Sequence, residues 1–246
     1  MAGKIYIVGV GPGGPGLRTP AAVEAIKRAD VVVGYRTYIN LISDLLHGKE
    51  VFAAGMREEL LRASVAVNRA SEDAVVAVVS DGDPQVFGMA PLVLELMSRS
   101  GASLDVEVVP GVTAALAAGA LLGSPLGNDF AVLNLSPLLT PREVILRRAE
   151  AVALADYVVA LYNPIDVDLL KEVISVFRRH RGGGTPVGIV KNAYREGQGV
   201  WLTTLDGIDY GLIDMRTTII VGNSETYVWN GFMITPRGYH RKYAYP

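Results

Sequence analysis

Short apolar runs and helix-like stretches alternate along nearly the whole of this 246-residue chain. The apolar runs are too short for helices and predict strands at 4–10, 31–34, 50–53, 74–79, 105–109, 130–135, 156–161, 186–191, 200–204 and 217–222. Helical patterns lie between them, at 20–29, 37–46, 57–71, 87–99, 112–122, 141–154 and 166–181. Over residues 4–109 this alternation favours a largely parallel sheet that is covered by helices on both faces, and a second alternation follows from residue 130.

One segment near the middle of the chain interrupts the alternation. Residues 123–129 read G-S-P-L-G-N-D and combine glycine, proline and asparagine, which are typical of chain breaks. We therefore expect an α/β protein with two α/β domains of similar size, 1–125 and 126–246. No stretch between them is long enough to form a flexible linker.

Composition excludes several classes of chemistry. The chain has no cysteine, which rules out disulfides, thiolate metal sites and cysteine nucleophiles. Its histidines, His47, His180 and His240, are far apart and lack metal-ligand spacing, so no metal site is expected. A formal net charge of −2 does not favour nucleic acid. The sequence shows no signal peptide and no apolar run of the ~18 residues that a membrane span needs, so we expect a cytoplasmic protein without membrane contact.

A glycine-rich stretch follows the first expected strand. Residues 8–16 read V-G-V-G-P-G-G-P-G and contain the G-x-G-x-x-G spacing of a dinucleotide-binding turn. Such a turn needs a helix that begins at its third glycine, but Thr19 and Pro20 place the helix start at about residue 20. The strand at 31–35 is also not followed by the acid that would bind a ribose. The open alternatives are a turn without ligand and a loop that approaches a different ligand.

Four further strands end in loops that are rich in glycine, proline or asparagine. These loops are 80–88 (S-D-G-D-P-Q-V-F-G), 110–114 (P-G-V-T-A), 162–164 (Y-N-P) and 192–197 (N-A-Y-R-E-G). Glycine and proline expose backbone groups and leave few side chains in the way. Because ligands bind at the carboxyl ends of strands in open α/β sheets, these loops predict a site for a ligand with many hydrogen-bonding groups.

Four motifs together carry a family resemblance. G-V-G-P-G near the start, G-D-P at 82–84, V-P-G-V-T at 109–113 and T-T-I-I-V-G at 217–222 resemble the tetrapyrrole (corrin and porphyrin) methylases. The resemblance covers the whole chain in the right order. It implies an S-adenosylmethionine-dependent C-methyltransferase with two α/β domains. It also implies a ligand cleft between them, where cofactor and tetrapyrrole meet.

Finer segments are similar to the ring-contracting branch of this family, which serves cobalamin biosynthesis. They are G-Y-R-T-Y (34–38), F-G-M-A (87–90), D-F-A-V (129–132), L-L-T-P (138–141), A-L-Y-N-P (160–164), T-P-V-G-I-V-K-N-A (185–193), G-N-S-E-T (222–226) and T-P-R-G-Y (235–239). The resemblance implies methylation at C17 of precorrin-3B, or of its cobalt form cobalt-precorrin-3, with loss of a meso carbon as an acetyl group, and a homodimer. The alternatives are a sibling methylase that acts at another carbon, such as C11 or C20, and a non-catalytic tetrapyrrole-binding protein.

By position, the resemblance also assigns residues to the cofactor. They are Pro12, Gly82, Asp83, Val86, Thr113, Ala114, Tyr162, Asn163, Ala193 and Thr218. Residues 82–86 would hold the methionine and ribose portions, and 113–114 would lie near the sulfonium and carboxylate. Residues 162–163 would border the adenosine, and Ala193 and Thr218 would close the adenine pocket through backbone contacts.

The chemistry calls for few reactive side chains. Methyl transfer from a sulfonium is an in-line displacement, in which the protein mainly positions the reactants and excludes water. Ring contraction also needs proton transfers, for which Asp83, Tyr35 and Tyr38 are the catalytic candidates. The alternative for Asp83, which we favour, is a ligand of the cofactor's ribose or amine.

The acceptor carries many carboxylates, which pair best with arginine and lysine. Candidate substrate-binding residues are Arg36, Lys191, Arg195 and Arg237, each of which could instead be a solvated surface cation. Where the family pattern has a histidine, this chain has Asn128. An amide does not shuttle protons as an imidazole does, so we expect ring contraction here to proceed without a histidine.

Overall fold

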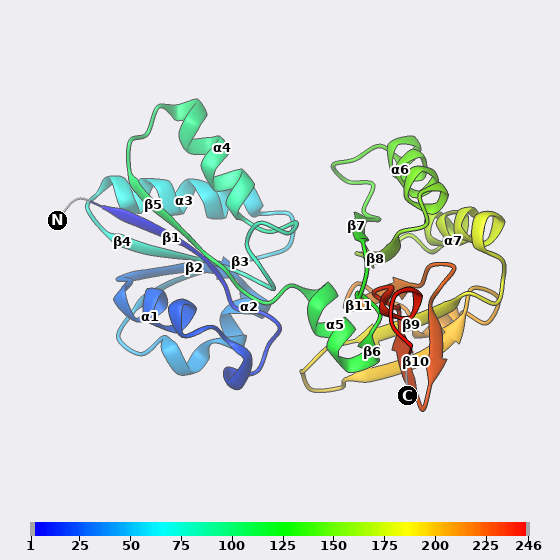
Figure 1. Cartoon of the computed structure of the whole chain (residues 1–246). Coiled ribbons are helices and arrows are strands. Elements are labelled where there is room, and N and C mark those ends of the chain that lie inside the picture. Colours follow the sequence, from blue (N-terminus) through cyan, green and yellow to red (C-terminus); the bar gives the residue numbers. More distant parts are fainter. Residues whose placement is uncertain (1–2, 245–246) are drawn as a thin grey trace. The chain divides into compact units, whose positions relative to one another are not determined.

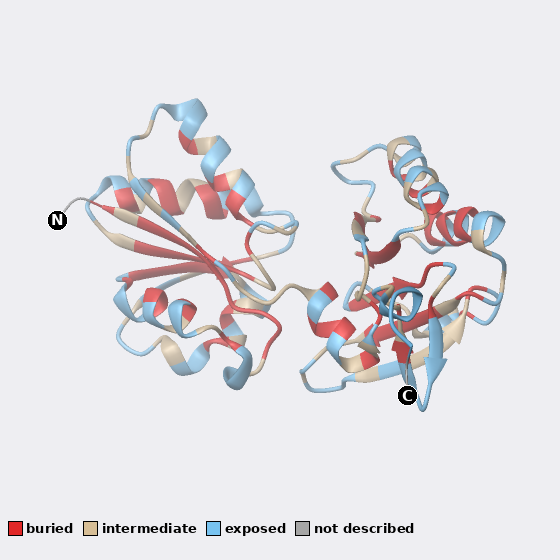
Figure 2. Cartoon of the chain, in the orientation of Figure 1, coloured by how far each residue is buried: buried red, intermediate tan, exposed pale blue. Residues whose placement is uncertain are grey.

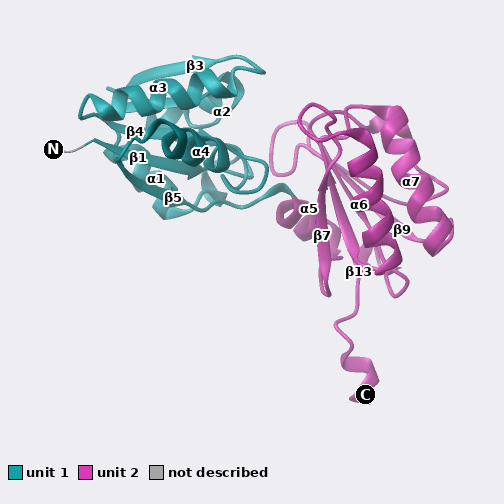
Figure 3. Ribbon diagram, turned by 90° about the horizontal axis from the view of Figure 1, so that it is seen from above, with its two compact units in different colours: residues 1–114 teal, residues 115–246 magenta. Residues whose placement is uncertain are grey.

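The structure is a computed structural model that describes residues 3–244 and forms two compact units, which divide between Ala114 and Ala115 (Figure 3). The division falls at the start of α5 (Ala114–Leu122). The domain boundary suggested by the sequence, at residues 125–126, lies after this helix and stays a prediction. Within residues 3–244, no helix is both long and apolar enough to cross a bilayer.

The first unit has a fully parallel five-stranded sheet in the order β3-β2-β4-β1-β5 (Figure 1). Its strands are β1 (Lys4–Gly9), β2 (Val31–Tyr35), β3 (Glu50–Ala54), β4 (Val75–Ser80) and β5 (Asp105–Val109). Its helices are α1 (Pro20–Arg28), α2 (Arg36–Leu41), α3 (Glu59–Ser71) and α4 (Ala90–Ser100), with short 3-10 turns η1 (Pro15–Leu17) and η2 (Ser43–Leu45). Helix α1 begins where the sequence predicts, because the Thr19 side chain accepts from the Ala22 amide and Pro20 occupies the first helical position.

Alternate residues of the central strands β1, β2 and β4 enter two separate cores. Ile5, Ile7 and Val78 pack against α3 and α4, whereas Tyr6, Val8 and their neighbours pack against α1 and the α2–η2 region. The central strands β1, β2 and β4 are almost wholly buried, as the red ribbons of Figure 2 show, whereas most residues of the edge strands β3 and β5 are exposed or half-buried. A parallel sheet with helices on both faces, as expected, is confirmed for this unit.

The second unit has a mixed five-stranded sheet in the order β10-β9-β11-β8-β7. Its strands are β7 (Phe130–Asn134), β8 (Val158–Tyr162), β9 (Pro186–Lys191), β10 (Gly199–Thr204) and β11 (Thr217–Val221). Only β7 and β8 are parallel neighbours. The parallel arrangement of the first sheet therefore does not extend to the second sheet. No α-helix lies between β9 and β10 or between β10 and β11, and a parallel neighbour needs a long crossover of that kind.

Helices α6 (Arg142–Leu154) and α7 (Val167–Arg181) cover one face of the second sheet, around the fully buried Phe177. On the sheet's other face, Leu122 of α5 lies against Gly188, where an added Cβ would be 2.3 Å from the leucine side chain. A small sheet in the order β12-β13-β6 joins β6 (Gly123–Ser124) to a hairpin of β12 (Tyr227–Trp229) and β13 (Phe232–Ile234). The short turns η3 (Tyr210–Leu212) and η4 (Tyr239–Arg241) complete the described elements.

Candidate functional site

The carboxyl ends of β1, β4 and β5 bring three of the expected loops together in the first unit. Gly9 lies beside Ser80 in the register of β1 and β4, and Val8 lies beside Val109 of β5. The loops that hold Pro12, 80–88 and 110–114 therefore leave the sheet at the same edge. Ligands bind at such an edge in open α/β sheets.

These three loops pack backbone against backbone, which explains their glycines. A Cβ on Gly11 would lie 2.3 Å from the Gly82 Cα, and a Cβ on Gly111 would lie 2.2 Å from the Gly82 carbonyl oxygen. The Gly11 amide donates to that same carbonyl oxygen at 3.1 Å. A Cβ on Gly9 would be 2.7 Å from the Gly111 nitrogen. The first two glycines of the dinucleotide-like spacing are thus required by loop packing, not by a pyrophosphate.

The Asp83 carboxylate ties two of these loops together. Its Oδ1 accepts from the Gln85 amide at 2.9 Å, and its Oδ2 accepts from the Gly111 amide at 3.1 Å. Each oxygen keeps a further lone pair for a ligand. Asp83 therefore has a structural role in the first unit, besides the catalytic or cofactor role that the sequence suggests.

The two tyrosine candidates lie together at the end of β2. The rings of Tyr35 and Tyr38 meet edge to face, with centroids 5.1 Å apart and planes at 84°. The buried Arg62 places its guanidinium carbon 5.9 Å from the Tyr35 ring centroid, and its Nη1 donates to the Gly55 carbonyl oxygen at 2.6 Å. Sequence reasoning missed Arg62, which sits within an otherwise ordinary helix pattern. Arg36 is exposed in the first turn of α2.

The second sheet gathers another group of predicted residues along one edge. Lys191, at the end of β9, pairs in the ladder with Thr217, at the start of the antiparallel β11. Tyr162, at the end of β8, pairs with Asn134, at the end of β7. The strand register thus brings four predicted cofactor residues to this edge: Tyr162, Asn163, Ala193 and Thr218.

Tyr162 and the left-handed residues give this edge a fixed shape. The buried Tyr162 hydroxyl oxygen accepts from the Ala115 amide in the first turn of α5. Asn163, Asn192 and Tyr194 have left-handed backbones, with φ of 53°, 49° and 58°. Asparagine tolerates this region well, but tyrosine does so rarely. These two residues, Asn192 and Tyr194, flank Ala193, and a strained backbone such as that of Tyr194 is common at ligand sites.

Lys191 is already paired within its own unit. Its Nζ lies 2.8 Å from an oxygen of Asp214, a carboxylate that Arg216 also contacts. Burial raises the pKa of the Asp214 carboxyl, but hydrogen bonds from Lys191 and Arg216 outweigh it and bring that pKa to about 2. The Arg195 amide donates to the Asn192 carbonyl oxygen at 2.9 Å, which places Arg195 on the same edge.

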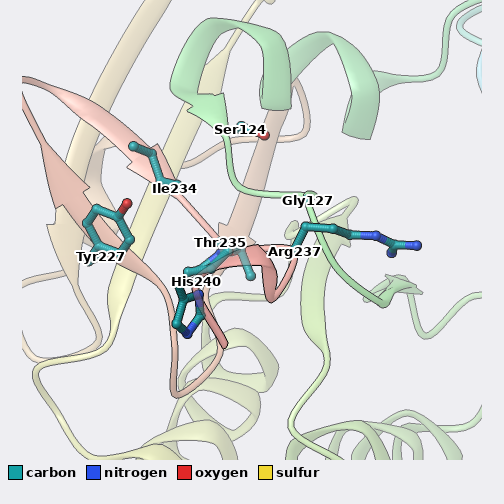
Figure 4. A pocket seen from close by; sticks show the side chains of 8 residues that line it. Ser124, Gly127, Tyr227, Ile234, Thr235, Arg237 and His240 are labelled. Carbon is teal, nitrogen blue, oxygen red and sulfur yellow. The ribbon is translucent and has the colours of Figure 1, made fainter. Parts of the chain in front are cut away.

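Arg237 lies away from this edge. A cavity of about 520 Å³ is lined by Ser124, Gly127, Tyr227, Ile234, Thr235, Pro236, Arg237 and His240 (Figure 4). The Thr235 hydroxyl is 2.8 Å from that of Thr226, which follows the carboxyl end of β11, at the opposite edge of the sheet. In Figure 4 the Arg237 side chain extends away from Tyr227 and His240. Within the second unit, the structure does not bring Arg237 together with Tyr162 and Thr218.

Comparisons with known proteins identify the family to which these two sheets and their loops belong. The family model for tetrapyrrole (corrin/porphyrin) methylases matches residues 4–209. A Salmonella typhimurium protein named "Probable cobalt-factor III C(17)-methyltransferase" is 42% identical over 238 residues, which cover 96% of this chain and 99% of that one. The Archaeoglobus fulgidus protein CbiHC, named as a cobalamin biosynthesis protein, is 46% identical over 98% of this chain. The chain spans about half the length of that relative and of one from Priestia megaterium.

Solved structures show the same likeness in three dimensions. The crystal structure of the methyltransferase CobJ superposes with a TM-score of 0.90 at 33% identity, covering 95% of this chain and 100% of that one. A Thermus thermophilus uroporphyrin-III C-methyltransferase, complexed with S-adenosylhomocysteine, has a TM-score of 0.68 at 26% identity, covering 89% of this chain and 97% of that one. All the strand-end loops that the sequence singles out lie within the matched residues. The chain therefore belongs to the tetrapyrrole (corrin/porphyrin) methylases.

Proposed function

We propose that this chain binds S-adenosylmethionine and transfers its methyl group to C17 of precorrin-3B or of a cobalt form of that ring, with ring contraction. The chain would thus be a precorrin-3B C17-methyltransferase of cobalamin biosynthesis. The observation that carries the proposal is the 42% identity, over nearly the full length of both chains, to a relative named for cobalt-factor III C(17) methylation. A sibling activity at C11 or C20 is the alternative.

The residues on the two edges fit the proposed cofactor chemically. S-adenosylmethionine carries positive charge on its sulfonium and its amine, and when bound it supplies an electrophilic methyl carbon. None of the ten proposed cofactor residues is cationic, and the one charged member is Asp83. The others offer backbone groups, a phenol and an amide, which suit a nucleoside. Binding of an analogue to the Thermus relative supports the same assignment.

Exposed apolar side chains on the strand-end loops fit the acceptor. Leu138 and Leu139 follow β7, and Ile165 follows β8; the Leu139 side chain is 96% exposed. In the first unit, Phe87 and Met56 are half exposed on loops after β4 and β3. Apolar groups can cover the faces of a macrocycle and exclude water during methyl transfer. These loops are therefore our candidates for contact with the ring.

The polar rim of the ring needs cations, and the candidates are not equivalent. Lys191 is neutralised by Asp214, and Arg237 lies at the other edge of its sheet. Arg36 is exposed and forms no ion pair with the described residues. We therefore rank Arg36 first for a substrate carboxylate and Arg195 second.

The proton transfers of ring contraction are assigned to the first unit. Tyr35 and Tyr38 are the preferred donors, because Asp83 already holds two backbone amides. Arg62 lies over the Tyr35 ring, with its guanidinium carbon 5.9 Å from the ring centroid, and stabilises its position. Asp83 is preferred as a ligand of the cofactor's ribose or amine.

We also propose a homodimer. The hairpin of β12 and β13 exposes Tyr227, Val228, Trp229 and Phe232, and β12 is an edge strand. Exposed aromatic clusters of this kind mark protein interfaces.

A cytoplasmic location remains a prediction from the sequence.

Mass spectrometry tests the activity. The purified chain is incubated with S-adenosylmethionine labelled at the methyl carbon, together with precorrin-3B or its cobalt form. The expected product carries one added methyl group, at C17 by carbon NMR, on a contracted ring. A label at another carbon would identify a sibling methylase. Binding without turnover of either ring form would identify a binding protein.

A further inference from the structure

Two asparagine side chains are joined where β7 and β8 end. The Asn163 Nδ2 donates to the Asn134 Oδ1 at 3.0 Å, and the Ser136 backbone amide donates to the same oxygen at 3.0 Å. Asn134 is the last residue of β7, and Asn163 directly follows β8. Neither side chain contributes to the apolar core.

The Ser136 amide fixes which way both side chains point. A backbone N–H can only donate, so the Asn134 atom that it meets must be the oxygen. That oxygen can only accept, so Asn163 must present its NH2 group to it. One backbone group in the 134–136 turn therefore sets the orientation of two amides.

This arrangement leaves the Asn163 Oδ1 as a directed acceptor. Among residues 3–244, none donates a hydrogen bond to that oxygen. The oxygen is also not one of the buried atoms without a partner, so it is open to a donor from outside the protein. The Asn163 backbone is itself held, with φ at 53° and its carbonyl oxygen accepting from the Ile165 amide at 2.8 Å. A fixed backbone and a fixed amide together hold one acceptor in place on the edge that also carries Thr218 and Ala193.

We propose that Asn134 is a positioning residue that holds the Asn163 amide so that its oxygen accepts a hydrogen bond from the nucleoside of S-adenosylmethionine. The inference rests on the proposed function, because it assumes that cofactor at this edge. Two nucleoside groups can donate such a bond, the adenine amino group and a ribose hydroxyl. Asn134 would act only through Asn163, without itself needing to touch the cofactor.

Three variants separate this role from simple support of the fold. Asn134→Asp keeps an oxygen that accepts from both donors, so affinity for S-adenosylhomocysteine should stay within about twofold of the natural chain. Asn134→Leu removes that acceptor and frees the Asn163 amide, which should weaken binding roughly three- to tenfold, as expected for one misplaced hydrogen bond. Asn163→Asp brings two acceptor oxygens together and should weaken binding at least as much. Asn68→Leu, on an exposed position of α3, is the control.

Calorimetry with cofactor analogues gives the decisive readout. S-inosylhomocysteine lacks the adenine amino group, and the 2′-deoxy and 3′-deoxy analogues each lack one hydroxyl. The natural chain should lose affinity for the analogue that lacks the donor, whereas Asn134→Leu should bind that analogue and the parent ligand alike. The analogue that shows this pattern identifies the donor.

Other outcomes overturn the inference. Equal weakening of Asn134→Leu toward every analogue, with Asn134→Asp equally weak, would show that Asn134 only supports the fold. Unchanged binding in Asn134→Leu would overturn the inference and leave the proposed function standing. If the natural chain does not bind S-adenosylhomocysteine at all, the cofactor assignment and the inference both fail.

Discussion

The Asp83 carboxylate holds the Gly111 amide at 3.1 Å and so joins the loop after β4 to the loop after β5. The same side chain holds the Gln85 amide at 2.9 Å within its own loop. The Asp83 side chain thus fixes the positions of the loops after β4 and β5, whose glycines let their backbones pack closely. Its replacement should affect both folding and cofactor binding.

We expect Asp83→Ala to weaken binding of S-adenosylhomocysteine by about 1.5–3 kcal/mol, the usual range for a lost hydrogen bond to a charged group. It should also lower the melting temperature, because two backbone amides lose their acceptor. Calorimetry and thermal unfolding measure the two effects. Asp83→Asn, which keeps one acceptor oxygen, should fall between the natural chain and the alanine variant. Unchanged binding with abolished turnover would instead make Asp83 an acid or base.

Gly11→Ala should destabilise the first unit strongly. The new methyl group would lie 2.3 Å from the Gly82 Cα and 2.6 Å from the Val112 carbonyl oxygen, so the loops must separate. Overpacking of this kind costs ~1–3 kcal/mol. Gly16→Ala is the matched control, because a Cβ there meets nothing within 4 Å. Denaturant unfolding compares the two variants, and equal stabilities would contradict the packing account of Gly11.

The ion pair of Lys191 and Asp214 should make the second unit less stable at low pH. The folded pKa of Asp214, about 2, lies below its ordinary value of 3.8. The stabilisation is therefore complete above about pH 4 and is lost as the pH falls toward 2. Asp214→Asn should lower the free energy of unfolding near pH 6, and its deficit should shrink near pH 2.5.

Glu196→Gln is the control for this pair, since Glu196 is exposed in the neighbouring turn and pairs with no described residue. It should leave the free energy of unfolding unchanged at both pH values. A deficit of Asp214→Asn that persists at low pH would mean that the side chain acts through packing and not through charge.

Of the cations in the second unit, we expect Arg181 to contribute most to the free energy of unfolding. Its side chain is 1% exposed and donates to the carbonyl oxygens of Gly222, Val152 and Tyr157. Burial lowers its pKa to about 10, so it stays charged at neutral pH. Arg181→Met leaves three carbonyls without a donor and should cost ~3–5 kcal/mol. Arg179→Met, which removes an exposed pair with Glu150, should cost less than ~1 kcal/mol in the same unfolding measurement.

Local chemistry made much of the fold predictable from the sequence. The cap at Thr19 gave the start of α1, and short β-branched runs gave most strands. Strand direction in the second sheet was not predictable from alternation alone. The absence of a helix pattern between 191 and 199 was the available signal for an antiparallel pair, and it carries less weight than the repeated helices before it.

Side-chain pairing across strands accounts for what sequence reasoning missed at the candidate site. Lys191 meets Asp214 only because the end of β9 lies beside the start of β11. Asn134 meets Asn163 only because β7 and β8 are neighbours. These residues are 23 or more positions apart, and nothing in their local sequence encodes the contact. Strand order must be known first.

Ring contraction in this chain should not require a histidine. His47 precedes the amino end of β3, His180 is near the end of α7 within 2.5 Å of Glu150, and His240 lines the cavity beside Arg237. All three are therefore away from the sheet edges that carry the proposed site, and Asn128 cannot supply a proton as an imidazole would.

The variant with His47, His180 and His240 all replaced by alanine should keep most of its turnover and its pH–rate profile. Circular dichroism would confirm that it remains folded, because the loss of the His180 contact with Glu150 removes a partly exposed pair of small energetic value. The acid or base would then be a carboxylate such as Asp83, Tyr35, Tyr38 or substrate-held water. If a tyrosine carries the proton, Tyr35→Phe or Tyr38→Phe should slow contraction more than methyl transfer. If the triple variant is folded but inactive, and a limb near pH ~6.5 is lost with it, a histidine carries the proton and the tyrosine assignment is wrong.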